Sequence, residues 1–297
     1  MLCTKRTKQT NQFLCLAKGR VRVKITILYN KEAYMIKKIA VGFAFALAGL
    51  LLAVGVQAKT VRGEGRHMIH PLTHLMPFHA IEVRAEAQVD IWQKDTQSVS
   101  LSGKSNLVEL ADVRVENNTL VIDFKHPVKI KGNHALHVQI GVPHLESITV
   151  RGNGRVRLQE AFETTNITLS AMDKAYVTAD QLKADSVRMQ ATNQAEIDLD
   201  HLHVQKMEAG LFDKAEIELA GFAQEAQLVN NGSKEIDAAD LRVNQAHVQV
   251  NATGDVEVFA AESLKAEALG KGEIVYHGHP VLMRSGNLKH IQPAFEN

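Results

Sequence analysis

Apolar and polar residues alternate along much of the chain, and from Val156 onward the alternation repeats about every twenty residues. The first apolar residue after each turn keeps this spacing over six steps, with little variation between them. These residues are Val156, Val177, Ile197, Ile217, Ile236, Val256 and Ile274. A second apolar residue follows two positions later, and the residue between is polar in six of the seven repeats. This period of two is typical of a strand with one buried face.

Residues that favour tight turns precede each of these strands. The turn segments are GNG at 152, MDK at 172, TNQ at 192, FDK at 212, NGS at 231, ATG at 252 and GKG at 270. Gly, Asn and Asp tolerate the left-handed backbone that such turns require. A second apolar stretch lies midway in each repeat, as in ITLS at 167 and VRMQ at 187, so about two short strands are expected per repeat.

The fixed register predicts an all-β fold of stacked coils. One repeat cannot bury its own apolar side, whereas stacked repeats form a continuous core. We therefore expect a parallel β-helix, or β-solenoid, with rungs of about 20 residues. A β-sandwich is the alternative, because its strands also recur every few residues, but it has no reason to hold one register over six steps.

Residues 59–147 follow the alternation less regularly. FHAIEVRAEAQVDIWQ alternates from Phe78 to Trp92, and ADVRVENNTLVIDFK is predicted to be a hairpin turned by Asn117 and Asn118. We expect opening strands that continue into the stack. The resulting division is a lead segment at 59–74, a β-solenoid domain at 75–291 and a tail at 292–297.

Several segments resemble a known family. They are FHAIEV, LSGKSNLVELADVRVENNTLVIDF, VQIGVPHLESITVRGNGRV and GKGEIVYHGHPVL, which look like the head-GIN-domain family of auto-transporter adhesin head domains, a domain of unknown function. The resemblance covers about residues 75–291 and implies a right-handed parallel β-helix, an exported protein and no assigned catalytic residues. The family's repeated Gly-Ser-Gly turns survive here only near Gly152, Gly254 and Gly270.

The N-terminus has the pattern of an export signal. Residues 35–58, MIKKIAVGFAFALAGLLLAVGVQA, combine two lysines, an apolar run from Ile39 to Val56 and a small-x-small end, which predicts signal-peptide cleavage between Ala58 and Lys59. A retained membrane anchor is the alternative, because the length of this run is at the lower limit for spanning a bilayer. Residues 1–34 are basic and unlike a signal; we interpret them as an over-extended, disordered N-terminus.

Removal of residues 1–58 leaves an acidic protein. That segment holds ten of the 34 Lys and Arg but only one of the 33 acidic residues, so the remainder carries 24 basic and 32 acidic side chains, a net charge of −8. An acidic surface argues against nucleic-acid binding. Both cysteines, Cys3 and Cys15, also lie in this segment, so the mature chain is expected to have no disulfide, thiolate site or lipid attachment point.

The sequence contains no recognised catalytic motif. Gly-x-Ser-x-Gly, His-Glu-x-x-His and a phosphate loop are all missing from it. Histidines cluster at His67, His70, His74 and His79 and in the pairs His201/His203 and His277/His279. Without Cys, and with the pairs far apart, packed or exposed histidines are favoured over a zinc site. No catalytic, cofactor or metal site is therefore predicted.

Carboxylates recur at two outward positions from the third repeat onward. They are Glu196, Asp198, Glu216, Glu218, Glu235, Asp237, Asp255, Glu257 and Glu273. Stacked in register, they would form two acidic ladders, and like charges on adjacent strands are destabilising. Such a face favours a divalent cation or a basic partner. A solvated face, partly neutralised by nearby lysines such as Lys214 and Lys234, is the simpler interpretation.

These observations favour an exported, non-catalytic module that serves in cell-envelope adhesion or as a scaffold, with an unidentified protein or glycan as its ligand and a place in the periplasm, at the outer membrane or outside the cell. Two alternatives stay open. One is a polysaccharide-active β-helix enzyme, although the nearly constant repeat length leaves no room for long groove-forming loops. The other is a periplasmic assembly partner that binds, or forms a homo-oligomer, through an exposed end of the stack.

Overall fold

The computed structural model describes residues 58–132 and 135–294, which all belong to one compact unit, Gln57–Asn297. The first strands are β1 (Lys59–Arg62), β2 (His67–Leu72), β3 (Ala80–Val83), β4 (Ala87–Gln93), β5 (Ser98–Lys104), β6 (Ala111–Glu116), β7 (Thr119–Phe124), β8 (Val128–Lys131), β9 (Leu136–Val142) and β10 (Ser147–Val150). They are followed by β11 (Arg155–Ala171), β12 (Tyr176–Ala191), β13 (Glu196–Asp213), β14 (Glu216–Gly232), β15 (Ile236–Val250), β16 (Val256–Ala268), β17 (Ile274–His277), β18 (Val281–Gly286) and β19 (Ile291–Pro293). The helices are α2 (Ser105–Leu110) and the 3-10 turn η1 (Leu288–His290).

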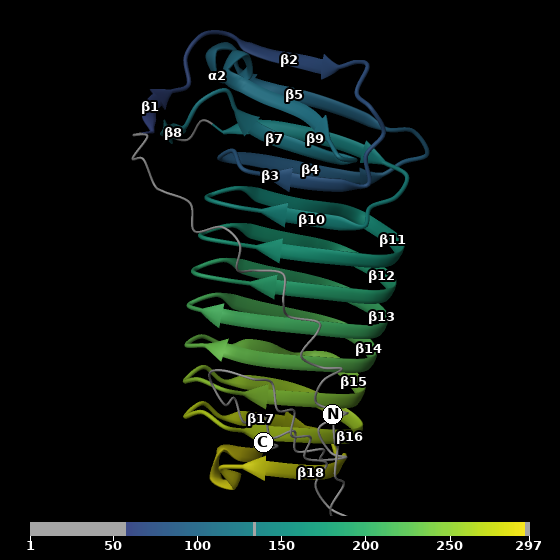
Figure 1. Cartoon of the computed structure of the whole chain (residues 1–297). Helices are drawn as coiled ribbons and strands as arrows, with labels where there is room; N and C mark the ends of the chain where they lie inside the picture. Colours follow the sequence, from purple (N-terminus) through teal and green to yellow (C-terminus); the bar gives the residue numbers. More distant parts are fainter. Residues whose placement is uncertain (1–57, 133–134, 295–297) are drawn as a thin grey trace, which may run out of the picture. The chain divides into compact units, whose positions relative to one another are not determined.

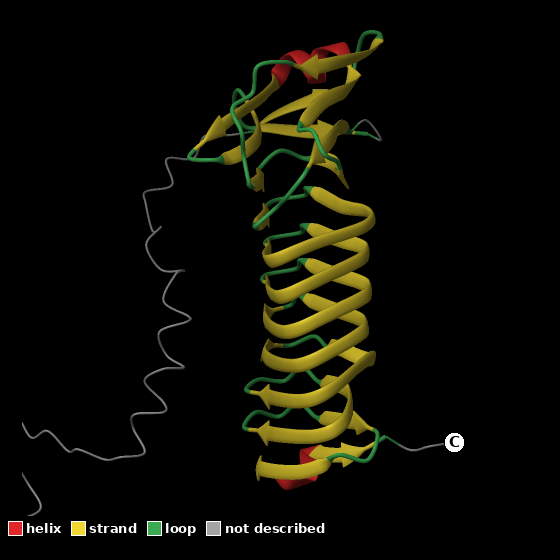
Figure 2. Cartoon of the chain, turned by 90° about the vertical axis from the view of Figure 1, so that its right-hand side faces the viewer, coloured by secondary structure: helices red, strands yellow, loops and turns green. Residues whose placement is uncertain are grey.

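Strands β11 to β16 form a stack in which each strand is one coil. Each pairs in parallel with the coil before it and the coil after it. Figures 1 and 2 show the coils lying one below another. The coil is right-handed, which is the hand that parallel connections within one sheet almost always take. The predicted β-solenoid is confirmed, and the β-sandwich alternative is wrong.

The repeated apolar positions lie directly above one another inside the stack. The column runs Val156, Val177, Ile197, Ile217, Ile236, Val256 and Ile274, and every adjacent pair is in register. No member is more than 1% exposed. Their burial in one continuous core is the main stabilising contribution, since the free energy gained grows with the apolar area removed from water.

Each coil is one long bent strand rather than two short ones. In β11, residues 155–158 pair regularly with β12, the register shifts between Leu158 and Ala161, and pairing then continues to Ala171. The shift turns the chain around a corner while keeping the backbone hydrogen-bonded. We call the wall formed by residues 155–158 and their equivalents face A, and the wall formed by 166–171 and their equivalents face C.

The turns between coils use the residues that the sequence singled out. Asp173, Asn193 and Asp213 have φ values of 66°, 64° and 58°, the left-handed region that Asn and Asp tolerate. The Asn193 side chain donates to the Asp173 carboxylate at 3.1 Å, so neighbouring turns are also bonded to each other. Further along, a Cβ added at Gly254 would collide with the carbonyl oxygen of Lys234, so this turn requires glycine.

Before the stack, the chain forms a cap, which we define as β1 to β9 with α2. Face C continues upward in parallel through β10, β3 and β7, and ends in the antiparallel strand β6. Face A continues in parallel through β4 and β9, and ends in the antiparallel strands β5 and β2. The expectation of opening strands continuous with the stack is thus correct for β3, β4, β7 and β9 only. Between the two walls, α2 buries Leu107 completely in the core.

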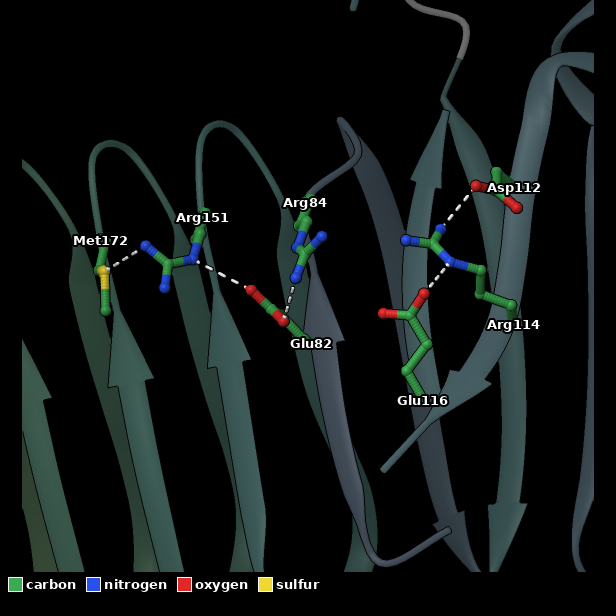
Figure 3. A network of polar contacts seen from close by, with 7 residues as sticks. All are labelled: Glu82, Arg84, Asp112, Arg114, Glu116, Arg151 and Met172. Atoms are coloured by element: carbon green, nitrogen blue, oxygen red, sulfur yellow. Dashed lines mark hydrogen bonds and ion pairs between the residues drawn. The ribbon is translucent and has the colours of Figure 1, made fainter. Parts of the chain in front are cut away.

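The predicted hairpin is present as β6 and β7. Asn117 and Asn118 have φ values of 49° and 61°, as a two-residue turn with two left-handed positions requires. On its outer surface, Arg114 contacts Asp112 and Glu116, each at 2.6 Å (Figure 3). These paired charges lie along β6, whose other edge has no partner strand among the described residues.

The stack ends at β18 and β19. The apolar column Leu228, Val248 and Ala266 continues in register to Arg284 of β18, which is charged and exposed. On face A, β19 pairs with β17 and ends at Pro293, which has no N–H to donate. A charged residue on the last strand and a proline are two devices that discourage a further strand from pairing with a free edge.

Within residues 58–132 and 135–294, no helix is both long and apolar enough to cross a membrane. The apolar run at 39–56 and the basic segment 1–34 lie outside the described residues. Of the predicted cleavage site, Ala58 is exposed and Lys59 begins β1.

Candidate functional site

The nine predicted carboxylates lie on face A, where neighbouring coils bring them together. Glu196 is in register with Glu216, and Asp198 with Glu218. The second ladder continues through Asp237 to Glu257. Glu235, Asp255 and Glu273 begin the same segment of the next three coils, and their carbonyl oxygens accept hydrogen bonds from the coil before. Coils about 4.8 Å apart therefore carry carboxylates directly above one another.

This arrangement changes the acidity of three of these groups. Burial, followed by the Glu216 carboxylate, raises the pKa of Glu196. The Asp198 carboxylate is the main cause that raises the pKa of Glu218, and burial adds to it. Burial and the Asp237 carboxylate raise the pKa of Glu235. At Glu218 the neighbouring carboxylate is the largest cause, so like charges repel one another at this point of face A at neutral pH.

Few cations offset this repulsion among the described residues. Lys234 approaches Glu216 at 3.8 Å, and Glu257 has the neutral or protonated ring of His277 at 2.6 Å as its hydrogen-bond partner. Lys214, which the sequence suggested as a neutralising charge, makes no ion pair within 4 Å there. The stacking of the ladders is thus observed, whereas their use by a divalent cation or a basic partner stays a prediction.

At the N-terminal end of face A, the ladder positions are occupied by other residues. Arg155 and Arg157 of β11 lie in register with Tyr176 and Thr178 of β12. The Arg155 guanidinium lies 5.7 Å from the centre of the Tyr176 ring. These residues surround an open depression of about 330 Å³.

Thr178 explains the depression. Its side chain is short, and it lies between Arg157 of the coil above and Asp198 of the coil below. The neighbouring side chains of Arg155, Arg157 and Tyr176 are longer, so the wall of face A is hollowed at this point. The sequence pattern did not identify this site, because it treats Thr178 as one more polar position. The signal that could have found it is the change from Arg and Tyr to carboxylates along the two ladders.

Hydrogen bonds order the polar groups of the depression. Arg157 donates to Asp180 through Nε at 3.0 Å and Nη2 at 2.7 Å. The Tyr176 hydroxyl donates to Asp198 at 3.2 Å. Burial, together with the Asp198 and Glu196 carboxylates, raises the pKa of Tyr176 to about 12, so the hydroxyl remains a donor at neutral pH.

The histidines do not converge. Within the part of the chain that the structure describes, no group of three or more His, Cys, Asp or Glu side chains has the arrangement of a metal site. The His203 ring stacks on Phe222 with centroids 5.4 Å apart, and His201 contacts the backbone oxygen of Asp180 at 3.1 Å. His70 lies on β2, far along the fold from the pair His277 and His279.

Fold and surface together define a right-handed parallel β-helix with a repetitive, charged outer wall. The chain belongs to the family described as putative auto-transporter adhesin, head GIN domain, whose model matches residues 77–280. The resemblance noted in the sequence is thereby confirmed.

Solved structures of low sequence identity share the fold. A putative lipid binding protein from Parabacteroides distasonis has a TM-score of 0.73 at 20% identity, and the match covers 80% of this chain and 100% of that one. A putative adhesin from Parabacteroides merdae has a TM-score of 0.72 at 20% identity with the same coverage. A putative adhesin from P. distasonis has a TM-score of 0.70 at 22% identity, covering 80% of this chain and 98% of the other. No curated protein matches the chain.

Proposed function

We propose that this protein is an exported, non-catalytic binding module of the cell envelope, used in adhesion or as a scaffold. The observation that supports the proposal best is the outer wall of the stack. Its coils are joined by tight turns, and their outward side chains form continuous ladders. Such a wall offers a long, pre-organised surface to a ligand, and binding to it needs no ordering of loops. Membership of a family described as adhesin head domains agrees with this role.

A polysaccharide-active enzyme is less well supported. A glycosidase needs one carboxyl group that apolar surroundings keep protonated, beside a second that is ionised. In the depression on face A, Asp180 faces the guanidinium of Arg157 and Asp198 accepts from Tyr176. Both carboxylates therefore already accept hydrogen bonds from side chains of the fold.

The proposal is tested in cells that produce the protein. We expect it in the envelope fraction or the medium, with an N-terminus at Lys59 by mass spectrometry. A chain that lacks residues 35–58 should stay in the cytoplasm. A surface is first chosen to which the purified protein binds. Cells without the gene should adhere to this surface less well than wild-type cells do. A cytoplasmic wild-type protein that begins at Met1 would contradict the export step, and unchanged adhesion would contradict the role.

A second candidate function is the binding of an amphiphile at the cap. Met68, Leu72 and Leu101 line an opening of about 350 Å³ between the two walls, together with Val108 and Val113. One neighbour of the same fold is described as a putative lipid binding protein. We propose a fluorescent fatty acid as the probe. Saturable binding that Ala111→Phe removes, but Ala161→Phe on the exposed corner of β11 does not, would favour this function, and an absence of binding would exclude it.

A further inference from the structure

The depression on face A contains polar groups that the fold itself does not use. The Arg155 guanidinium has no carboxylate within 4 Å among the described residues. Likewise, the Gln88 amide and the Asp200 carboxylate form no hydrogen bond there with another described residue. All three side chains line the depression. Donors and an acceptor that lack a hydrogen-bond partner among the described residues therefore line the same depression.

The charges of the lining distinguish between classes of ligand. Two arginines and four aspartates contribute, namely Arg155, Arg157, Asp90, Asp180, Asp198 and Asp200. The excess of carboxylates disfavours an anion. A simple cation would have to approach the guanidinium groups. A sugar hydroxyl both donates and accepts, so a ring that carries several hydroxyls can use both kinds of group at once.

We infer that this depression binds one or two sugar units of a neutral glycan. The inference rests on the proposed binding function and names its ligand class. A volume of about 330 Å³ is at the lower end of the range for small-molecule sites, so it fits a short stretch of glycan rather than a whole chain. The ligand would lie over Thr178, between Arg155 and Gln88 on one side and Asp200 on the other. The Tyr176 ring, held by its bond to Asp198, forms the side wall.

The test is saturation-transfer NMR and titration of the full-length chain with cellobiose, chitobiose, maltose and lactose. At least one of these is expected to bind, and Thr178→Phe, which fills the depression, should abolish the binding. The control is Thr168→Phe, an exposed position of the neighbouring coil on face C, which should bind as the wild type does. Circular dichroism of both variants checks that they keep the fold.

Two further variants test the polar contacts without changing the shape. Asp200→Asn and Arg155→Gln each remove one charge-assisted hydrogen bond, so each should weaken binding about tenfold. Glu225→Gln, at an exposed position of β14 away from the depression, should have no effect.

Each other outcome overturns the inference. These outcomes are no binding by any of the four sugars, binding that survives Thr178→Phe, and preferential binding of an amino acid or of calcium. If the Thr178→Phe variant still reaches the envelope and still supports adhesion, the glycan site in this depression is wrong while the proposed function stands. Release of reducing ends from a bound sugar would instead contradict the non-catalytic role.

Discussion

The cap and the stack are both built from strands in which apolar and polar residues alternate, but the strands are arranged differently in the two regions. In the stack, each residue has an equivalent directly above and below it, so one buried position such as Ile197 is repeated in every coil. In the cap, neighbours are unlike: β9 lies between β4 and β5, although about forty residues separate it from either. Repetition gives the stack a uniform core, whereas the cap must close one end with antiparallel edges and α2.

Charges show the same contrast. At the junction of the cap and the stack, Glu82 contacts Arg84 at 2.7 Å and Arg151 at 3.2 Å, and Arg151 also reaches Met172 (Figure 3). The hydrogen bond from Arg84 lowers the pKa of Glu82, although burial acts in the opposite direction. On face A, repetition instead places like charges together. In a stack of repeated coils, the same kind of outward residue therefore recurs in successive coils, so that carboxylates at these positions repel one another.

The largest effect is expected from removing one member of the apolar column. Ile197→Ala should lower the free energy of unfolding by about 2–5 kcal/mol, since the coils above and below cannot collapse into the space. Ile69→Ala in the cap, where the side chain is 69% exposed, should change it by less than about 0.5 kcal/mol. Denaturant unfolding of both variants checks this. Equal losses would show that truncating a buried side chain of the stack costs no more stability than truncating an exposed side chain of the cap.

A second variant tests a polar residue in a buried column. Asn230 is fully buried between Leu211 and Val250; its amide donates to Lys234 and Asp255 carbonyl oxygens at 2.7 and 2.8 Å, and its Oδ1 accepts from Gly232 at 2.8 Å. Asn230→Ala removes all three of these hydrogen bonds.

The expected loss from Asn230→Ala is about 2 kcal/mol, because each buried unsatisfied group costs about 1–3 kcal/mol. Asn251→Ala, at an exposed turn, is the control and should cost less than about 0.5 kcal/mol. The midpoints of thermal unfolding give both values. A stable Asn230→Ala protein would mean that the turn is held by its neighbours alone.

The two kinds of charge predict opposite responses to pH. The pKa of Glu82 is lowered, so its stabilisation is present at neutral pH and is lost as the pH falls through that lowered pKa; Glu82→Gln should cost about 1 kcal/mol at pH 7. The pKa of Glu218 is raised, so the protonated carboxyl group favours the folded protein at low pH. This contribution to stability is lost as the pH rises through the raised pKa.

Glu218→Gln should therefore stabilise the protein at pH 7, by about 0.5 kcal/mol after allowance for solvent screening, and the gain should vanish below about pH 4.5. Unfolding at several pH values and low salt measures both variants. Glu208→Gln, which loses the ion pair with Arg188, is the control and should not stabilise. Destabilisation by Glu218→Gln at pH 7, or protection of the wild type by millimolar calcium alone, would indicate that the ladder is a cation site.

The smallest effect on stability is expected at the open end of the stack. Arg284→Leu extends an apolar column to the surface of β18, so we expect little change in unfolding but concentration-dependent self-association in sedimentation experiments. Arg284→Lys should behave as the wild type does. If the wild type already associates through this end, as the sequence left open, Arg284→Leu would add nothing further.

The stack could be predicted from the sequence because each of its features depends on local pattern. The spacing of Val177 within its repeat is enough to predict that it is buried, and the residue type of Asp173 is enough to predict a left-handed turn. Once the repeats are stacked in register, the carboxylates at equivalent outward positions must also lie above one another. The cap could not be predicted in the same way. Alternation in β9 identifies a strand but not its partner, which is set by contacts between distant residues.

The depression over Thr178 was missed for a related reason. Its shape depends on the size of side chains that belong to three coils, and its hydrogen bonds join residues about twenty positions apart. Binary patterning records Thr178, Arg157 and Asp198 as the same kind of position. Only the three-dimensional register shows that the short Thr178 side chain lies beside the long side chains of Arg157 and Tyr176.

Outward residues of successive coils lie directly above one another, and pulsed electron paramagnetic resonance can measure this stacking. In a chain with Cys3 and Cys15 replaced by Ser, spin labels are placed at Thr168 and Lys265, or at Thr168 and Met283, on one ladder of face C. Five coils predict a separation of about 24 Å between these positions and six coils about 29 Å. If the second pair were not farther apart than the first by the spacing of one coil, the coils would not be stacked in register.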